Sequence, residues 1–146
     1  MLCAGCAETR CADRPSVRVQ LLLVNDVYVL EPVAGRGGLA RVATLVRDLR
    51  ARSPHTLFVL AGDTLSPSLL STLRRGAQMI EGWNAVGLDL ATFGNHEFDF
   101  GPAVLAERMR ESRFPWLSAN VLERATGLPF GGARRGVAWD FDGVRV

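Results

Sequence analysis

Four short apolar runs alternate with stretches of helical periodicity along this chain, and that alternation limits the possible folds more than any other feature. The apolar runs are 17–24, 56–61, 88–93 and 116–119. Runs of this length, with few polar interruptions, are typical of strands that are buried on both faces. Apolar residues recur at helical spacing between them, at 39–49, 79–86 and within 102–113. The order βαβαβαβ predicts an α/β fold with a largely parallel sheet and helices on both of its faces.

Small and turn-forming residues predict where the helices begin and end. Ser66 suits a helix cap and Pro67 suits the first helical position, so we expect a helix to begin there. Gly76 and Gly87 predict the ends of this helix and of the next one.

The carboxyl end of the chain predicts a β-hairpin, because Asp142-Gly143 separates two short apolar runs. The chain ends within the second of these strands. We therefore expect residues 16–146 to form part of a domain, preceded over 1–15 by a disordered tail that contains the cysteines.

The three cysteines of the chain, Cys3, Cys6 and Cys11, all lie in this tail. A Cys-x-x-Cys pair with a third cysteine is compatible with zinc, but no fourth ligand follows at a suitable spacing. The interpretation that we favour is a tail with reduced thiols.

Composition excludes several classes of function. With 48% hydrophobic and 22% charged residues, the 146-residue chain has an ordinary soluble composition. The net charge of +2 is too small to indicate a nucleic-acid polymer or an anionic membrane as partner. No apolar run approaches the length of a membrane span. The first residues show no secretory signal, which favours a cytoplasmic location.

Polar side chains gather where the predicted strands end. They are Asn25, Asp26, Asp63, Asn95, His96 and Asn120. The carboxyl ends of parallel strands form the edge at which open α/β sheets bind ligands. One Asp at such a position would indicate no more than a turn or a cap. Four strands that all end in this way indicate a site.

The residue types at these positions suit phosphate-ester chemistry on two metals. Asp and Asn supply hard oxygen ligands, and two divalent ions about 3.5–4 Å apart need a bridging carboxylate and further ligands on each side. A nearby imidazole can protonate a leaving oxygen. Asp99 lies three residues after His96, where its carboxylate would orient the imidazole and raise its pKa.

Three motifs at these positions resemble the calcineurin-like metallophosphoesterases. They read L-L-V-N-D-V-Y, V-L-A-G-D-T-L-S-P-S-L-L-S and F-G-N-H-E-F-D-F-G, and each lies at the end of a predicted strand. With the later F-P-W-L-S-A-N-V, they are most similar to the branch of 5'-nucleotidases and cyclic-nucleotide phosphodiesterases. The resemblance extends from Val17 to Val146. It implies the amino-terminal half of a metallophosphoesterase sandwich, and hydrolysis of nucleotide monophosphates or cyclic nucleotides.

The resemblance also implies roles for individual residues. Asp26 would bind the first metal, Asp63 would bridge both, and Asn95 would bind the second. His96 would be the catalytic imidazole and Asp99 its partner, whereas Asn120 receives no role. The cofactors implied are two divalent ions, drawn from Mn, Zn, Fe, Mg or Ca, and the partner is a small phosphorylated molecule.

The chain departs from the family at two points. The family's opening motif is Asp-x-His, but the third position here is Tyr28. A phenol with a pKa near 10 binds divalent metals poorly, so Tyr28 either weakens the first site or serves a harder trivalent iron. The family also completes both sites with later histidines, which this chain lacks. His55 precedes the second strand, at the opposite end of the sheet, and we do not expect it to bind metal.

Two functions remain open at this point. One is a metal-dependent hydrolase, a 5'-nucleotidase-like phosphatase, of which this chain holds half of the site. The other is a binding or structural module that keeps the fold with weak or no catalysis, which Tyr28 and the missing histidines favour. A dinucleotide-binding oxidoreductase is excluded because no Gly-rich turn follows the first strand. The loop at Gly37-Gly38, with Arg41, either meets an anion or is a solvated loop.

Overall fold

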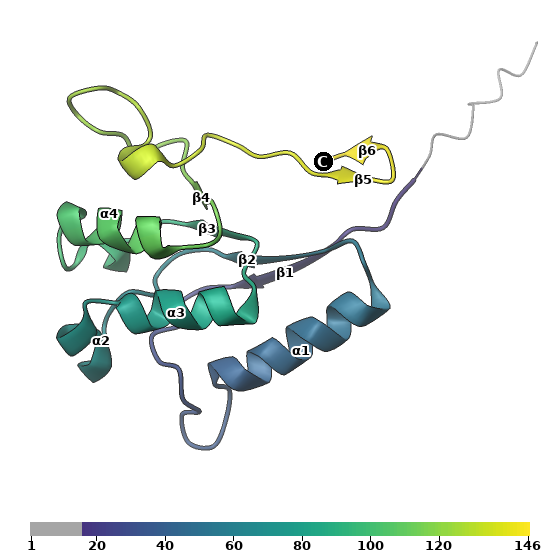
Figure 1. Cartoon of the computed structure of the whole chain (residues 1–146), viewed down its shortest axis with the longest axis horizontal. Coiled ribbons are helices and arrows are strands. Elements are labelled where there is room, and N and C mark those ends of the chain that lie inside the picture. Colours follow the sequence, from purple (N-terminus) through teal and green to yellow (C-terminus); the bar gives the residue numbers. More distant parts are fainter. Residues whose placement is uncertain (1–15) are drawn as a thin grey trace, which may run out of the picture.

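Four parallel strands lie side by side in one sheet, in the order in which they occur along the chain (Figure 1). The computed structural model describes residues 16–146, so the cysteine-containing tail over 1–15 lies outside the described residues. The strands are β1 (Gln20–Val24), β2 (Thr56–Leu60), β3 (Leu90–Thr92) and β4 (Trp116–Leu117). All three pairings are parallel, which brings the carboxyl ends of the strands to one edge, as predicted.

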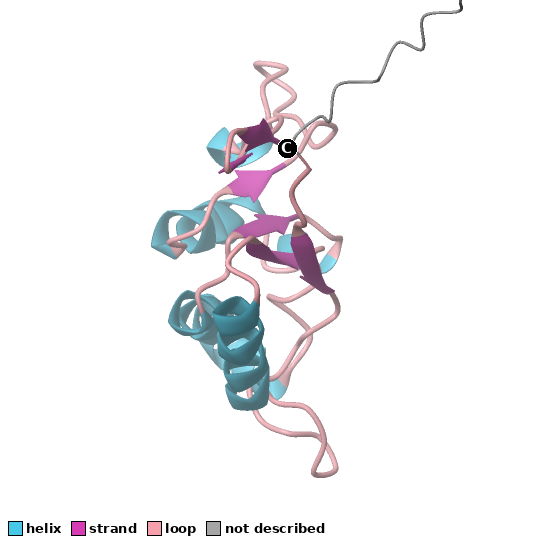
Figure 2. Cartoon of the chain, turned by 90° about the vertical axis from the view of Figure 1, so that its right-hand side faces the viewer, coloured by secondary structure: helices cyan, strands magenta, loops and turns pink. Residues whose placement is uncertain are grey.

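The long helices lie on a single face of the sheet, which differs from the prediction of helices on both faces (Figure 2). They are α1 (Leu39–Arg52), α3 (Ala77–Val86) and α4 (Pro102–Glu111), and a short α2 (Leu69–Arg74) precedes α3. The strand order explains the difference. Right-handed crossovers between strands that advance in one direction place every helix on the same side, and only a reversal of strand order would fill the other.

The helix after β2 begins later than predicted. Ser68, not Ser66, is its cap: Ser68 has an extended backbone, and its hydroxyl accepts a hydrogen bond from the Ser71 amide at 3.0 Å. Pro67 therefore lies before the helix. The predicted turns at Gly76 and Gly87 are confirmed, since both have left-handed backbones at the two ends of α3.

The core lies between the helices and the sheet. Phe58, Leu60, Met79, Trp83 and Leu105 are each at most 1% exposed. Burial of such side chains contributes roughly 1.5–3 kcal/mol each to the free energy of unfolding. This packing fixes the strand ends relative to one another.

One buried hydrogen-bonded chain links the core to the loops at the strand ends. The Trp83 indole donates to the Thr64 hydroxyl at 2.8 Å, and that hydroxyl donates to the Val27 carbonyl at 2.8 Å. Helix α3 therefore holds the loops that follow β1 and β2 in one arrangement.

The opposite face of the sheet is open. Leu21 and Leu23 alternate with inward-facing residues along β1 and are 60% and 56% exposed. Parallel sheets in proteins are normally covered on both faces, so these leucines mark a surface that favours a further layer. No helix among the described residues is long and apolar enough to cross a membrane.

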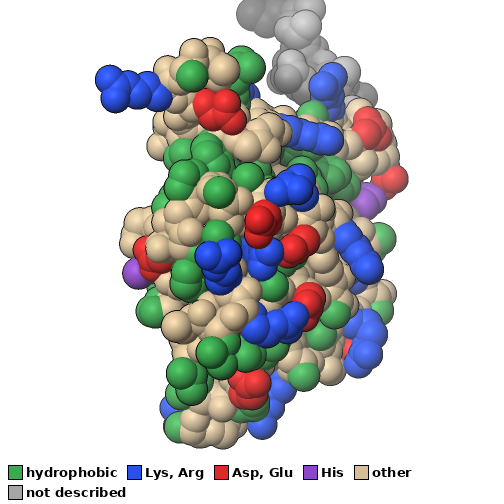
Figure 3. Space-filling view, turned by 60° about the vertical axis from the view of Figure 1, so that its left-hand side comes forward, with side chains coloured by type: hydrophobic (Ala, Val, Ile, Leu, Met, Phe, Trp, Pro, Cys, Tyr) green, Lys and Arg blue, Asp and Glu red, His purple; other side chains and the backbone are tan. Residues whose placement is uncertain are grey.

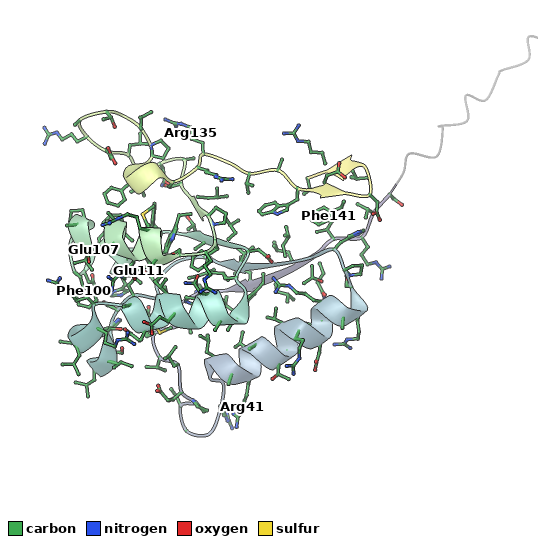
Figure 4. All side chains as sticks on the ribbon, viewed as in Figure 1. Arg41, Phe100, Glu107, Glu111, Arg135 and Phe141 are labelled. Carbon is green, nitrogen blue, oxygen red and sulfur yellow. The ribbon has the colours of Figure 1, made fainter. Side chains whose placement is uncertain are left out.

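The predicted hairpin forms as a separate two-stranded sheet. It comprises β5 (Asp140–Phe141) and β6 (Val144–Arg145), joined through Asp142-Gly143. His55, at the amino end of β2, lies 3.3 Å from the Asp142 carboxylate and packs its ring 5.3 Å from that of Phe141 (Figure 4). His55 therefore contacts the hairpin, and the two histidines of the chain lie on opposite sides of the molecule (Figure 3).

Candidate active site

The turns after β1 and β2 place two aspartates side by side at the edge of the sheet. Asp26 and Asp63 have positive φ angles of 55° and 60°, in the left-handed region that most side chains avoid. The Asp26 amide donates to the Gly62 carbonyl at 3.3 Å, which joins the two turns. Non-glycine residues persist in such conformations where the surrounding structure holds them, commonly at functional sites.

The buried Glu97 carboxylate holds the turn after β2 against the turn after β3. One oxygen, Oε2, accepts from the amides of Asp63 at 2.8 Å and Gly94 at 2.5 Å, and Oε1 accepts from the amide of Thr64 at 2.7 Å. Glu97 is 0% exposed. Three converging amides satisfy a carboxylate that would otherwise be costly to bury.

Glycines allow these turns to approach closely. A Cβ added to Gly94 would lie 2.1 Å from Asp63 Oδ1, and one added to Gly62 would lie 2.4 Å from the Gly94 amide nitrogen. Any side chain at Gly94 would therefore displace the Asp63 carboxylate. The glycines of the G-D and G-N-H-E-F-D motifs are required for packing at these positions.

Asp63 and His96 are connected through the backbone. Asp63 Oδ1 accepts from the His96 amide at 2.9 Å, at the start of the short 3-10 helix η1 (His96–Phe98). This contact orients the Asp63 carboxylate. The second oxygen of Asp63, Oδ2, receives no hydrogen bond from the described residues, so both of its lone pairs are available to another ligand.

The predicted partnership of His96 and Asp99 is present. His96 Nδ1 lies 2.7 Å from Asp99 Oδ2, and the Ser66 hydroxyl donates to the same oxygen. The hydrogen bond to Asp99 raises the pKa of His96 above its ordinary value. The hydrogen bonds from Ser66 and then His96 lower the pKa of Asp99. Because the carboxylate is an acceptor, Nδ1 carries the proton, and Nε2 is left for other contacts.

Asp26 is surrounded differently, because both of its carboxylate oxygens accept hydrogen bonds from its own loop. The Tyr28 hydroxyl donates to Oδ1 at 2.5 Å, and the Asn25 side-chain amide donates to Oδ2. The bond from Tyr28, and then that from Asn25, lower the pKa of Asp26. The same bond raises the pKa of Tyr28 to about 12, so the phenol stays protonated as a donor. The Tyr28 ring meets the His96 ring edge-on, with centroids 5.7 Å apart.

The two predicted asparagines are both exposed. Asn95 is exposed and lies directly before His96 in the chain. The His96 amide in turn donates to Asp63. Asn120 follows β4, and its side-chain oxygen accepts from the Ser118 hydroxyl at 3.3 Å. Among the described residues, no hydrogen bond joins Asn120 to Asp63 or His96. Arg41, in the first turn of α1, donates to the Gly35 carbonyl at 2.6 Å, in the loop before that helix (Figure 4).

The donor set fits a divalent metal on the β2–β3 side and fits it less well on the β1 side. Asp63 and Asn95 offer hard oxygens, of the type that divalent cations prefer. Each oxygen of Asp26 already accepts one hydrogen bond, from Tyr28 or Asn25, which leaves one lone pair on each oxygen for an ion and competes for its negative charge. Within residues 16–146, no three His, Cys, Asp or Glu side chains lie close enough to hold a metal by themselves.

Sequence reasoning missed Glu97 and Ser66. Glu97 stands inside the G-N-H-E-F-D motif, where an acidic residue in a first helical turn is ordinary. The available signal was its place in a motif that otherwise carries site residues. Ser66 was interpreted as a helix cap, and its bond to Asp99 depends on the loop before α2 turning back to η1.

Comparison with known proteins supports the motif resemblance. The family model described as calcineurin-like phosphoesterase matches residues 19–140. The snake venom 5'-nucleotidase of Gloydius brevicauda is 40% identical over 118 residues, which is 73% of this chain and 20% of that protein.

Two solved structures share the fold. The NAD nucleotidase of Haemophilus influenzae matches with a TM-score of 0.76 at 28% identity, over 88% of this chain and 25% of that one. The 5'-nucleotidase precursor of Thermus thermophilus matches with a TM-score of 0.72 at 31% identity, over 87% of this chain and 27% of that one. This chain therefore spans about a fifth to a quarter of the length of these relatives. Over nearly all of its described residues, the chain belongs to the calcineurin-like phosphoesterase family.

Proposed function

We propose that this chain contributes half of the active site of a metal-dependent phosphate-ester hydrolase, with nucleotide monophosphates or cyclic nucleotides as substrates. The observation that carries the proposal is the connected set of Asp63, His96 and Asp99, in which hydrogen bonds link one imidazole residue to two carboxylates. The family match and the 5'-nucleotidase relatives support the same reaction class.

Divalent metal ions, two in number by the resemblance, would supply an activated water and neutralise the phosphate oxygens. Asp63 would bridge them, Asn95 would bind one, and Asp26 would bind the other. The hard oxygens of this set are compatible with Mn, Mg, Ca, Zn or Fe.

His96 acts on the leaving group. Asp99 accepts a hydrogen bond from the Nδ1–H of His96, so Nε2 is the nitrogen that meets the substrate. The raised pKa of His96 increases the fraction of imidazolium at neutral pH, which favours donation of a proton to the departing oxygen. Ser66 keeps Asp99 in place.

A second candidate, a phosphoesterase-like binding module with weak or no catalysis, is favoured by one observation. Both oxygens of the Asp26 carboxylate accept hydrogen bonds, from Tyr28 and Asn25, and these bonds compete with metal binding on that side. The two candidates differ in whether phosphate release occurs.

The test is complementation. Residues 19–140 replace the matching segment of the Thermus thermophilus 5'-nucleotidase, and release of phosphate from AMP and of 4-nitrophenol from bis(4-nitrophenyl) phosphate is measured with added Mn²⁺. We expect metal-dependent release that Asp63→Asn abolishes. A chimera that is folded, as checked by its melting temperature, contradicts the proposed hydrolase if it releases neither product, or if it keeps full activity with Asp63→Asn.

A further inference from the structure

A pocket with a basic lining lies between the carboxyl end of α4 and the short 3-10 helix η2 (Phe130–Gly132) (Figure 1). Its volume is about 390 Å³, within the range of about 300–1,000 Å³ that is usual for small-molecule sites. Phe114 and Pro115 line it and precede β4, so the pocket lies at the amino ends of the strands. The candidate active site lies at the carboxyl ends of the strands, and the two share no residue.

Three arginines line this pocket, and no acidic residue does. Arg110 and Arg113 come from the end of α4 and the loop after it, and Arg134 comes from the segment after η2. Among the described residues, Arg113 and Arg134 form hydrogen bonds only through their backbones. Arg110 uses one side-chain nitrogen, Nε, to donate to the Ala106 carbonyl at 3.2 Å. Three positive charges therefore converge on one pocket whose lining holds no counter-charge.

The acidic residues beside the pocket walls already have partners. The Glu111 carboxylate accepts a hydrogen bond from the Arg108 guanidinium at 2.8 Å. The Glu123 carboxylate accepts one from the Gly131 amide at 3.1 Å. Neither carboxylate forms an ion pair with the three arginines of the pocket, so their charge is left for a ligand.

The arginines stand on a backbone that is held in place. The Arg113 amide donates to the side-chain oxygen of Asn84, in α3, at 2.8 Å. The Arg134 amide donates to the Trp116 carbonyl at 2.8 Å, and the Arg134 carbonyl accepts from the Ser118 amide at 2.9 Å. The segment after η2 is therefore paired with β4 as a strand would be. Side chains that start from a fixed backbone lose less freedom when they close on a ligand.

A role at the helix end explains only one of the three arginines. Arg110 lies in the last turn of α4, where a positive charge complements the helix dipole. Arg113 lies beyond the end of that helix, and Arg134 lies on a different segment.

The lining suits a phosphate group. A guanidinium carries N–H donors in a flat, fixed arrangement that matches the oxygens of phosphate, and it stays charged at every physiological pH. A phosphate monoester has three terminal oxygens and close to two negative charges, which suits three guanidinium groups. A carboxylate has two oxygens and one charge, so it would leave part of the lining without a partner.

We infer that this pocket, at the amino edge of the sheet, binds the phosphate group of a small dianionic molecule, at a site separate from the metal-dependent one. The arginines hold the phosphate directly, so no metal is required. Two sources share this chemistry. One is inorganic phosphate, and the other is a phosphate monoester whose organic group covers Met109 and Pro115, two apolar residues of the lining.

Titration of the metal-free chain, followed by the nuclear magnetic resonance signals of the indole N–H groups, tests the inference. Trp116 lines the pocket and donates to the Ser112 hydroxyl at 3.0 Å, so its signal senses the pocket. Trp83 donates to Thr64 at 2.8 Å, so its signal senses the loops of the candidate active site. At about pH 8, where a phosphate monoester is a dianion, we expect phosphate and phenyl phosphate to shift the Trp116 signal and leave the Trp83 signal in place. Acetate should bind at least about tenfold more weakly, because it has one charge and fewer oxygens.

Two double variants with the same change in net charge give the control. Arg113→Gln with Arg134→Gln removes two guanidinium groups from the pocket, whereas Arg124→Gln with Arg145→Gln removes two exposed ones outside it. We expect the Kd of phosphate to rise at least about tenfold in the first and to change less than about twofold in the second, since distant exposed charges are screened. All four positions are exposed, and melting temperatures check that both variants fold.

Each outcome of these titrations has one meaning. Tighter binding of phenyl phosphate than of phosphate identifies a monoester as the ligand, and equal affinities identify inorganic phosphate. A Trp116 signal that moves with neither compound overturns the inference. So does an equal loss of affinity in the two double variants, or binding of acetate as tight as that of phosphate. Because no metal is present, these results do not depend on the proposed hydrolase.

Discussion

The β2–β3 side and the β1 side of the candidate site differ in what holds their carboxylates. Asp63 is fixed from the interior: the buried Glu97 holds its backbone, and the His96 amide orients its side chain. Asp26 is fixed from its own exposed loop, by Tyr28 and Asn25. Asp63 therefore has one side-chain oxygen that accepts no hydrogen bond from the described residues, whereas both oxygens of Asp26 accept one.

This difference shows how one substitution can change half of a site. The family motif has a histidine where this chain has Tyr28, and a histidine would add a ligand there. A protonated phenol instead adds a donor, which turns toward the nearest carboxylate. The β2–β3 side is held by the buried Glu97 carboxylate, to which Tyr28 makes no hydrogen bond, although the Tyr28 ring meets the His96 ring edge-on.

The largest effect that we expect is on catalysis from the β2–β3 side. In the complementation chimera, His96→Asn should lower turnover by about 10²–10⁴, because it removes the proton donor to the leaving group. Metal content, measured by elemental analysis, should stay near that of the parent chimera. A loss of metal together with activity would show that His96 is a ligand and not the proton donor.

The next largest effect concerns stability. Glu97→Gln should lower the free energy of unfolding by about 2–4 kcal/mol, because an amide cannot accept from all three backbone donors and one buried N–H is left opposed by another donor. Asp26→Asn, on an exposed carboxylate, is the control and should change stability by less than about 0.5 kcal/mol. Urea unfolding followed by tryptophan fluorescence measures both. Equal effects of the two variants would remove the difference between the sides.

A smaller effect concerns the titration of His96. Asp99→Asn should lower the His96 pKa toward its ordinary value of 6.5, because the hydrogen bond from Nδ1 then goes to a neutral acceptor. The raised pKa stabilises the fold below pH 6.5, and this contribution is lost as the pH rises through the folded-state pKa. The lowered pKa of Asp99 stabilises the fold above pH 3.8.

The loss of stability in Asp99→Asn should therefore be greatest between about pH 4 and 6.5. The pKa is measured from the His96 ring signals of the metal-free chain, and stability by urea unfolding across the same pH range. A pKa of His96 that does not move would show that Asp99 is not its partner in solution.

The sequence predicted the strand ends, their common edge and the pair of His96 and Asp99, because these depend on local patterns and on spacing along the chain. It did not predict that all long helices share one face, since that follows from strand order, which periodicity does not encode. Nor did it predict the role of Glu97, which exists only because the turns at Gly62 and Gly94 meet. The replacement at Tyr28 was evident from the sequence, but its contact with Asp26 required the structure.

Calorimetric titration of the chain with Mn²⁺, before and after Tyr28→His, tests the central comparison most directly. We predict weak binding by the unaltered chain, lost in Asp63→Asn, and binding at least about tenfold tighter in Tyr28→His, since that change frees Asp26 and adds a nitrogen ligand. Weaker binding in Tyr28→His would show that Tyr28 is itself a ligand, and would contradict the assignment of the β1 side as the side that is closed to metal.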